Sequence, residues 1–111
     1  MSKYYSESEM RAVRGAFERE VLGWPGVSQR KMLGCPCYWS RGKMFAFLTN
    51  GGVVLTQLSE AERSALGRKF ATSPFGSGAR VVERWPRIPV AGARDLKQVL
   101  PFVRKSYESL R

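Results

Sequence analysis

The chain has 111 residues, of which 43% are hydrophobic and 25% charged, and we expect a single domain spanning residues 1–111. It contains no histidine, which excludes Ser-His-Asp and Cys-His nucleophile systems and metal sites built on imidazole. It has no apolar run of about 18 residues that would predict a membrane span. Its first residues lack the apolar segment of a signal peptide, so we expect a cytoplasmic protein with reduced thiols.

The net charge of +10 lies outside the first 25 residues. Residues 1–25 carry four basic and four acidic side chains, whereas residues 26–111 carry fifteen basic and five acidic ones. The body of the domain is therefore basic. A basic body favours anionic partners such as nucleic acid, acidic lipid or an acidic protein.

The first predicted element is a helix that follows residues 6–9 (SESE), which have the spacing of a capping box. Arg14 and Glu18 form an i,i+4 pair on its polar side. The run GWPG at residues 23–26 predicts its end. Apolar residues at helical spacing form one stripe, which comprises Met10, Val13, Phe17 and Val21.

Residues 27–58 predict consecutive strands joined by short turns. We expect a strand over residues 27–33, after which Pro36, which cannot donate to a ladder, marks an edge, a bulge or a turn. Residues 37–40 and 43–49 predict a hairpin around Arg41 and Gly42. The Asn-Gly pair at residues 50–51 predicts another tight turn, followed by a returning strand over residues 53–58.

The segment 43–49 (KMFAFLT) is apolar on both faces, which is typical of a strand covered on both sides. Such a strand lies inside a sheet rather than at its edge. Simple alternation places Phe45 and Phe47 on one face and Met44, Ala46 and Leu48 on the other.

A second capping box at residues 59–62 (SEAE) predicts a helix that ends near Phe70. We expect Ala61, Ala65 and Leu66 to face inward together with Phe70. Residues 71–79 (ATSPFGSGA) are rich in Ser, Gly and Pro and predict a loop. This segment lacks the spacing of a phosphate-binding P-loop and leads into a strand, so a plain connector is the expected role.

Residues 80–90 contain two short strands, and Pro86 and Pro89 confine the second to the edge of a sheet. The last helix begins at Asp95, and Pro101 inside it predicts a bend. Strands joined by short turns are antiparallel. We therefore predict an α+β fold of two layers, with helices packed on a mainly antiparallel sheet in the order α-β-β-β-α-β-β-α. The apolar face of the last helix comprises Leu96, Val99, Leu100, Val103, Tyr107 and Leu110.

Three pieces of the chain resemble a known family: RKMLGCPCYWSRGKMFAFL at residues 30–48, SPFGSG at 73–78 and LPFVRKSYE at 100–108. They resemble the N-terminal domain of TfoX (Sxy), the bacterial competence regulator, in its stand-alone form, and more distantly the YjbR-like proteins. The resemblance covers residues 24–108. Leu33 stands where the family more often has Phe, and Cys37 is not part of the pattern.

What the resemblance implies is a fold, in the order α-β-β-β-α-β-β-α. The competence regulators are linked to transcription, but they carry a second domain, which we do not expect within these 111 residues. The family has no agreed catalytic residues to transfer. A regulatory role is therefore an expectation from the resemblance, without an assigned partner.

Cys35-Pro36-Cys37 is the motif closest to a chemical site. Two thiols two residues apart can bind a soft metal or take part in redox chemistry. A single CxC without histidine lacks the spacing of a zinc site, and alternate residues of an extended strand are awkwardly placed for a disulfide. We therefore interpret both cysteines as small buried or half-exposed residues, and we expect no metal and no cofactor.

Basic residues with interleaved aromatic side chains are the best candidate for a binding surface. Charge holds a nucleic-acid backbone, and aromatic rings stack on bases. The alternative is a solvated basic face with its aromatic side chains in the core, since no helix-turn-helix, zinc-finger or RNA-recognition signature is present. The candidate nucleic-acid-binding residues are Arg30, Lys31, Arg41, Lys43, Arg80, Arg84, Arg87 and Trp39.

These features predict a small non-enzymatic binding or regulatory domain, with nucleic acid as the first partner to test. The alternative is a protein-interaction module, acting as a homodimer or as an adaptor for an acidic partner, through Trp39 and an edge strand over residues 87–90. No catalytic pairing of Glu, Lys or Cys is visible in the sequence, and we expect no membrane partner.

Overall fold

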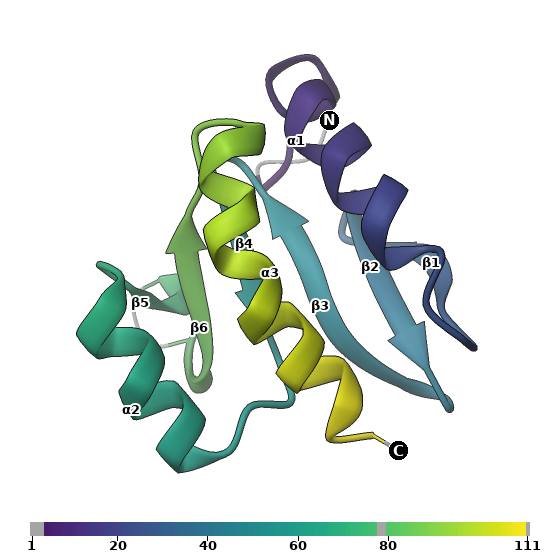
Figure 1. The fold of residues 1–111 in the computed structure, drawn as a ribbon. Helices are drawn as coiled ribbons and strands as arrows, with labels where there is room; N and C mark the ends of the chain where they lie inside the picture. The colour runs from purple at the N-terminus through teal and green to yellow at the C-terminus, as the bar shows by residue number, and fades with distance from the viewer. Residues whose placement is uncertain (1–3, 78–79, 111) are drawn as a thin grey trace.

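The computed structural model describes residues 4–77 and 80–110, which form one sheet with three helices (Figure 1). The sheet has six strands in the order β1-β2-β3-β4-β6-β5, and every neighbouring pair is antiparallel. This confirms the predicted α+β class, with four strands before the second helix. The elements are α1 (Glu7–Val21), β1 (Ser28–Met32), β2 (Cys35–Ser40), β3 (Lys43–Thr49), β4 (Gly52–Leu55), α2 (Glu60–Lys69), β5 (Ser73–Ser77), β6 (Arg80–Pro89) and α3 (Ala93–Glu108).

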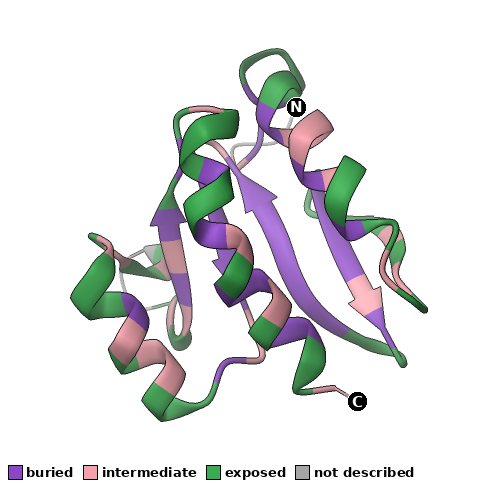
Figure 2. Ribbon diagram, viewed as in Figure 1, coloured by how far each residue is buried: buried purple, intermediate pink, exposed green. Residues whose placement is uncertain are grey.

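Helices α1 and α3 lie across one face of the sheet, and α2 lies at its β5–β6 end (Figure 1). The predicted stripe of α1 is buried in full, and α3 buries Val103 and Tyr107 against the sheet. Phe70, at the end of α2, packs edge-on against Phe102 of α3 with ring centroids 6.1 Å apart. Buried residues are concentrated in the central strands and on the inner sides of α1 and α3 (Figure 2). None of the three helices is long and apolar enough to cross a membrane.

The two predicted capping boxes have different outcomes. Ser59 and Glu62 exchange both hydrogen bonds at the start of α2, as predicted. The prediction for residues 6–9 is wrong, because the Ser6 side chain caps no amide of α1. Instead, the backbone N–H of Ser6 donates to Asn50 Oδ1 at 2.5 Å, so the β3–β4 turn anchors the start of α1.

Two tight turns set the register of the first three strands. Leu33 and Gly34 have φ values of 54° and 79°, and Arg41 and Gly42 have 55° and 77°, as type I′ hairpin turns require. Pro36 is predicted at an edge, a bulge or a turn; it lies in β2, an interior strand between β1 and β3, although it has no pairing partner in β3. Proline is tolerated there because the pairing of β2 with β3 begins only one residue later, at Cys37.

A register shift in the β2–β3 pairing corrects the predicted faces of β3. Tyr38 pairs with Ala46 but Trp39 pairs with Met44, so Phe45 is an extra residue of the kind that forms a β-bulge. Phe45 packs against Tyr107 of α3 at 5.4 Å. Phe47 packs on the other face of the sheet, and alternation along the strand therefore breaks at Phe45.

Residues 71–90 differ most from the prediction. Residues 73–77 of the expected loop form β5, and residues 78–79 lie outside the described residues. The two expected short strands are one strand, β6, which lies between β4 and β5 instead of at an edge. Pro86 pairs with Pro74, so two residues that lack an N–H face one another and the ladder continues beyond them.

The face of the sheet opposite α1 and α3, which we call the helix-free face, is covered by aromatic side chains. Tyr38 contacts Phe17 of α1 at 4.7 Å, so the adjacent residues Cys37 and Trp39 point to the helix-free face. Phe47, opposite Cys37, contacts Phe75 of β5 at 4.9 Å although two strands separate β3 from β5. The β5–β6 hairpin therefore curls over the centre of this face.

Candidate nucleic-acid interface

Four of the predicted binding residues lie on the first three strands and the β2–β3 turn, around one end of the sheet: Arg30 is on the face of Trp39, whereas Lys31 and Lys43 point to the face of α1 and α3. Arg30 and Lys31 are adjacent on the edge strand β1, Arg41 is in the β2–β3 turn, and Lys43 begins β3 directly opposite Ser40. All four are exposed. We call these four residues the β1–β3 basic surface.

No carboxylate balances the β1–β3 basic surface from its own strands. The sequence has no acidic residue between Glu20 and Glu60, a stretch that contains β1 to β4. In the part of the chain that the structure describes, the ion pairs involve Arg14 and Arg104, not this surface. The four cations are therefore available to an anionic partner.

Trp39 lies beside this surface on the helix-free face. Its indole ring is half-buried, and the guanidinium carbon of Arg30 lies 5.3 Å from the ring centroid, within the range of a cation–π contact. The Trp39 Nε1 atom is buried and has no hydrogen-bond acceptor among the described residues. A buried donor without an acceptor costs about 1–3 kcal/mol.

Arg87 does not belong to an open basic surface, although the sequence pattern placed it there. Its Nε–H donates to Thr49 Oγ1 at 3.2 Å and its Nη2 donates to the backbone oxygen of Asn50 at 2.5 Å. The side chain is half-buried on the helix-free face, opposite Val54. Its role in the structure is to tie β6 to the β3–β4 turn.

Arg80 and Arg84 are exposed on β6, which is separated from β3 by β4. Arg84 lies at a groove together with Arg63 of α2, a residue that the sequence did not single out. No sequence signal pairs these two residues, because they meet only through the placement of α2 beside β6. The eight predicted residues therefore do not form one surface. Trp39 lies beside the β1–β3 basic surface, Arg80 and Arg84 are exposed on β6, and Arg87 has a structural role.

Cys35 and Cys37 are buried, with exposed fractions of 2% and 0%. Burial raises the pKa of Cys37 to about 11, with a smaller contribution from the neighbouring Cys35, whose own pKa is also raised by burial. Both thiols therefore stay protonated near neutral pH, which makes them poor nucleophiles and poor metal ligands. Within residues 4–77 and 80–110, no group of three Cys, Asp or Glu side chains could hold a metal ion.

Comparison with known proteins gives no relative for this chain: no family model, no curated protein and no solved structure matches it. The resemblance to the TfoX N-terminal domain therefore stays a prediction that rests on the motifs at residues 30–48, 73–78 and 100–108.

Proposed function

We propose that this chain is a non-enzymatic binding domain of the TfoX N-terminal type that holds nucleic acid on the β1–β3 basic surface. The observation that carries the proposal is the Arg30–Trp39 pair, in which an exposed guanidinium lies 5.3 Å from the centroid of a half-buried indole ring. A phosphate can bind Arg30, and an unpaired base can stack on the exposed part of the ring.

Single-stranded nucleic acid fits this surface better than a duplex. The basic residues lie on a sheet edge and a two-residue turn, and no helix carries them into a major groove. Single-strand binding needs basic side chains and an aromatic platform; Arg30 and Trp39 supply both on the helix-free face, and a flexible strand can pass around the β1 edge to reach the other three cations. We therefore expect weak sequence preference and a steep fall of affinity with salt.

The test is fluorescence anisotropy of labelled single- and double-stranded oligonucleotides across a salt series. The test variant replaces the four residues of the β1–β3 basic surface by glutamine. The control variant removes the same number of positive charges from exposed helix positions. Its substitutions are Arg11→Gln, Arg19→Gln, Arg94→Gln and Lys105→Gln.

We expect the test variant to lose at least about tenfold in affinity at physiological salt and to show a shallower salt dependence, because phosphate contacts release counterions. The control variant should stay close to the unsubstituted protein. Equal losses in both variants would mean that binding follows net charge alone, and the proposal would be abandoned. Circular dichroism of both variants checks that the fold is kept.

The alternative is a protein-interaction module, and one observation favours it. Met32 and Leu33, at the β1–β2 turn, are 37% and 65% exposed, which is unusual for apolar side chains of this size. They lie at the end of β1, which is an edge strand. The prediction of a docking edge at residues 87–90 is wrong, because β6 is an interior strand. Static light scattering distinguishes this alternative, since a dimer broken by Leu33→Ser would favour it.

A further inference from the structure

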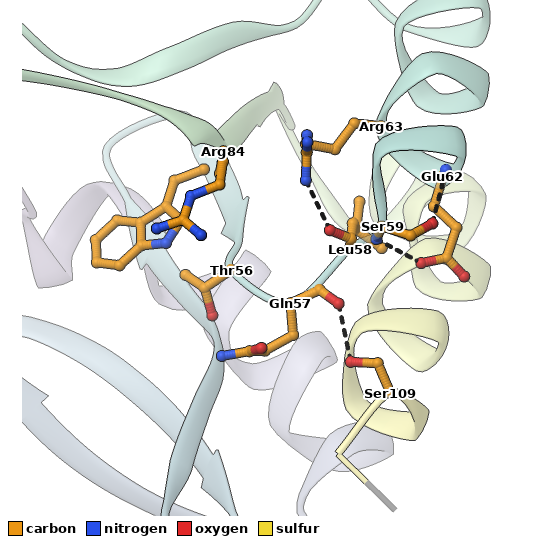
Figure 3. Close-up of a pocket in the computed structure, with 9 residues that line it drawn as sticks. Thr56, Gln57, Leu58, Ser59, Glu62, Arg63, Arg84 and Ser109 are labelled. Atoms are coloured by element: carbon orange, nitrogen blue, oxygen red, sulfur yellow. Dashed lines mark hydrogen bonds between the residues drawn. The ribbon is translucent and has the colours of Figure 1, made fainter.

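A groove of about 650 Å³ lies where β4 passes into α2 (Figure 3). Its walls come from residues 56–59, the first turns of α2, β6 and the end of α3. That volume lies within the range of about 300–1,000 Å³ that is usual for small-molecule sites. None of the β1–β3 basic surface lines the groove, so an occupant would be recognised independently of the proposed interface.

The floor of the groove is held rigid by its own hydrogen bonds. The Thr56 hydroxyl donates to Met44 O at 2.6 Å, and the Gln57 side-chain amide donates to the same oxygen at 3.1 Å. The backbone N–H of Gln57 donates to Ser106 Oγ at 3.0 Å, and the Ser109 hydroxyl donates to Gln57 O at 2.8 Å. These polar groups are satisfied within the fold and leave recognition to the charged side chains.

The charged side chains of the groove favour an anion. Glu62, the one carboxylate that lines it, already accepts the Ser59 N–H at 2.9 Å in the capping box. Arg63 donates from Nη1 to Leu58 O at 2.8 Å, which fixes its guanidinium and leaves its other N–H groups uncommitted. Arg84 makes no hydrogen bond to the described residues and is exposed. In Figure 3 the two arginines reach into the groove from opposite walls.

An aromatic wall completes the groove. Trp85 lines it and is half-buried. Its ring is fixed by Phe47 at 5.7 Å and by Phe75 at 6.3 Å, so it offers a preformed flat surface. The volume exceeds that of a bare inorganic anion, and an organic group next to the anion would contact this ring.

We propose that this groove binds a nucleotide-sized phosphate monoester, with its phosphate between Arg63 and Arg84 and its base against Trp85. Guanidinium groups bind phosphate oxygens with charge-assisted hydrogen bonds, and two of them from opposite walls can hold different oxygens of one tetrahedral group. A free nucleotide and the terminal phosphate of a nucleic-acid strand present the same chemistry.

The test is isothermal titration with adenosine 5′-monophosphate, inorganic phosphate and adenosine. We expect saturable binding of the monophosphate, weaker binding of phosphate alone, and a loss of at least about tenfold in Arg84→Gln, since one charge-assisted contact disappears. Arg84 is exposed and its substitution leaves the capping box of α2 intact. Arg11→Gln is the matched control, because it removes an exposed charge of α1 that belongs to neither the groove nor the β1–β3 basic surface, and it should leave this affinity unchanged.

Three results would overturn the proposal: no saturable binding of the monophosphate, equal affinity for inorganic phosphate and the monophosphate, or full affinity in Arg84→Gln. A 5′-phosphorylated trinucleotide separates the two sources when it is titrated into the variant with glutamine at the four residues of the β1–β3 basic surface, since tighter binding than the monophosphate then assigns the groove to a strand end. Equal affinity for the trinucleotide and the monophosphate assigns the groove to a free nucleotide. Retention of oligonucleotide binding in Arg84→Gln, with loss of the monophosphate, shows that the groove and the β1–β3 basic surface act independently.

Discussion

Arg87 on β6 donates its Nε–H to Thr49 Oγ1 at 3.2 Å, across the strand β4 that lies between them. The same guanidinium also holds the backbone oxygen of Asn50 at 2.5 Å. Asn50 Oδ1 accepts the N–H of Ser6, so one arginine is connected through the turn to the start of α1. A residue that looks like part of a binding surface in the sequence is a structural link in the fold.

Replacing Arg87 by lysine keeps the charge but loses the fork of donors that reaches two acceptors. We expect the free energy of unfolding to fall by about 1–3 kcal/mol, because hydrogen bonds from a charged group to the buried Thr49 and the half-buried Asn50 are lost. Urea denaturation measures the change. Arg84, on the same strand, makes no hydrogen bond to the described residues. Arg84→Lys should therefore change the free energy of unfolding by less than about 0.5 kcal/mol. Equal losses in the two variants would contradict the structural role of Arg87.

The fold class followed from features local in the sequence. The Arg41-Gly42 turn, the Asn-Gly pair at residues 50–51 and the capping box at Ser59 each have a strong short-range signature. The run at residues 43–49, which is apolar on both faces, then marks β3 as central. These signals depend on neighbouring residues alone, and each of them appears in the structure at the predicted place.

Most of the errors arise from contacts across the sheet, which depend on strand register and not on the neighbouring residues in the sequence. The extra residue at Phe45 exists only in the register between β2 and β3. Pro86 is tolerated inside the sheet only because it faces Pro74 of β5. Arg87 is committed to the fold only because Thr49 lies within reach across β4. Composition and periodicity carry no information about such cross-strand partners.

A second prediction concerns Tyr38, which connects the sheet to α1. Its hydroxyl donates to Glu18 Oε2 at 2.6 Å, and the same oxygen accepts from Arg14 Nε at 2.9 Å. Burial, followed by this bond to a carboxylate, raises the pKa of Tyr38 well above its ordinary value. The phenol is therefore a donor throughout the physiological range, and its ring packs on Phe17 independently of the hydroxyl.

Tyr38→Phe keeps the ring and removes the bond to a charged acceptor, so we expect a loss of about 1.5–3 kcal/mol in the free energy of unfolding. Tyr107→Phe is a matched control, since its hydroxyl donates to a neutral acceptor, Pro25 O, at 2.6 Å and should cost about 0.5–1.5 kcal/mol. Denaturant unfolding of both variants shows which substitution lowers the free energy of unfolding more. A larger loss in Tyr107→Phe would argue against a charge-assisted bond between Tyr38 and Glu18.

The third prediction follows from the pKa of Cys37, which burial raises from 9.0 to about 11. Below pH 9 the thiol is protonated in both the folded and the unfolded state, so its contribution to stability does not change with pH. Between pH 9 and 11 the unfolded state loses the proton first. Since the unfolded state then binds fewer protons, the free energy of unfolding falls as pH rises through this window.

Cys37→Ala removes this titration. We therefore expect its destabilisation, measured by denaturant unfolding under a reducing agent, to be smaller at pH 10 than at pH 8, by about 1 kcal/mol. Val54→Ala shortens a buried side chain on the same face without a titrating group, and its destabilisation should be equal at the two pH values. If the destabilisation of both variants changed equally between pH 8 and pH 10, the alkaline loss of stability would come from other groups, such as Tyr5, whose pKa burial raises to about 12.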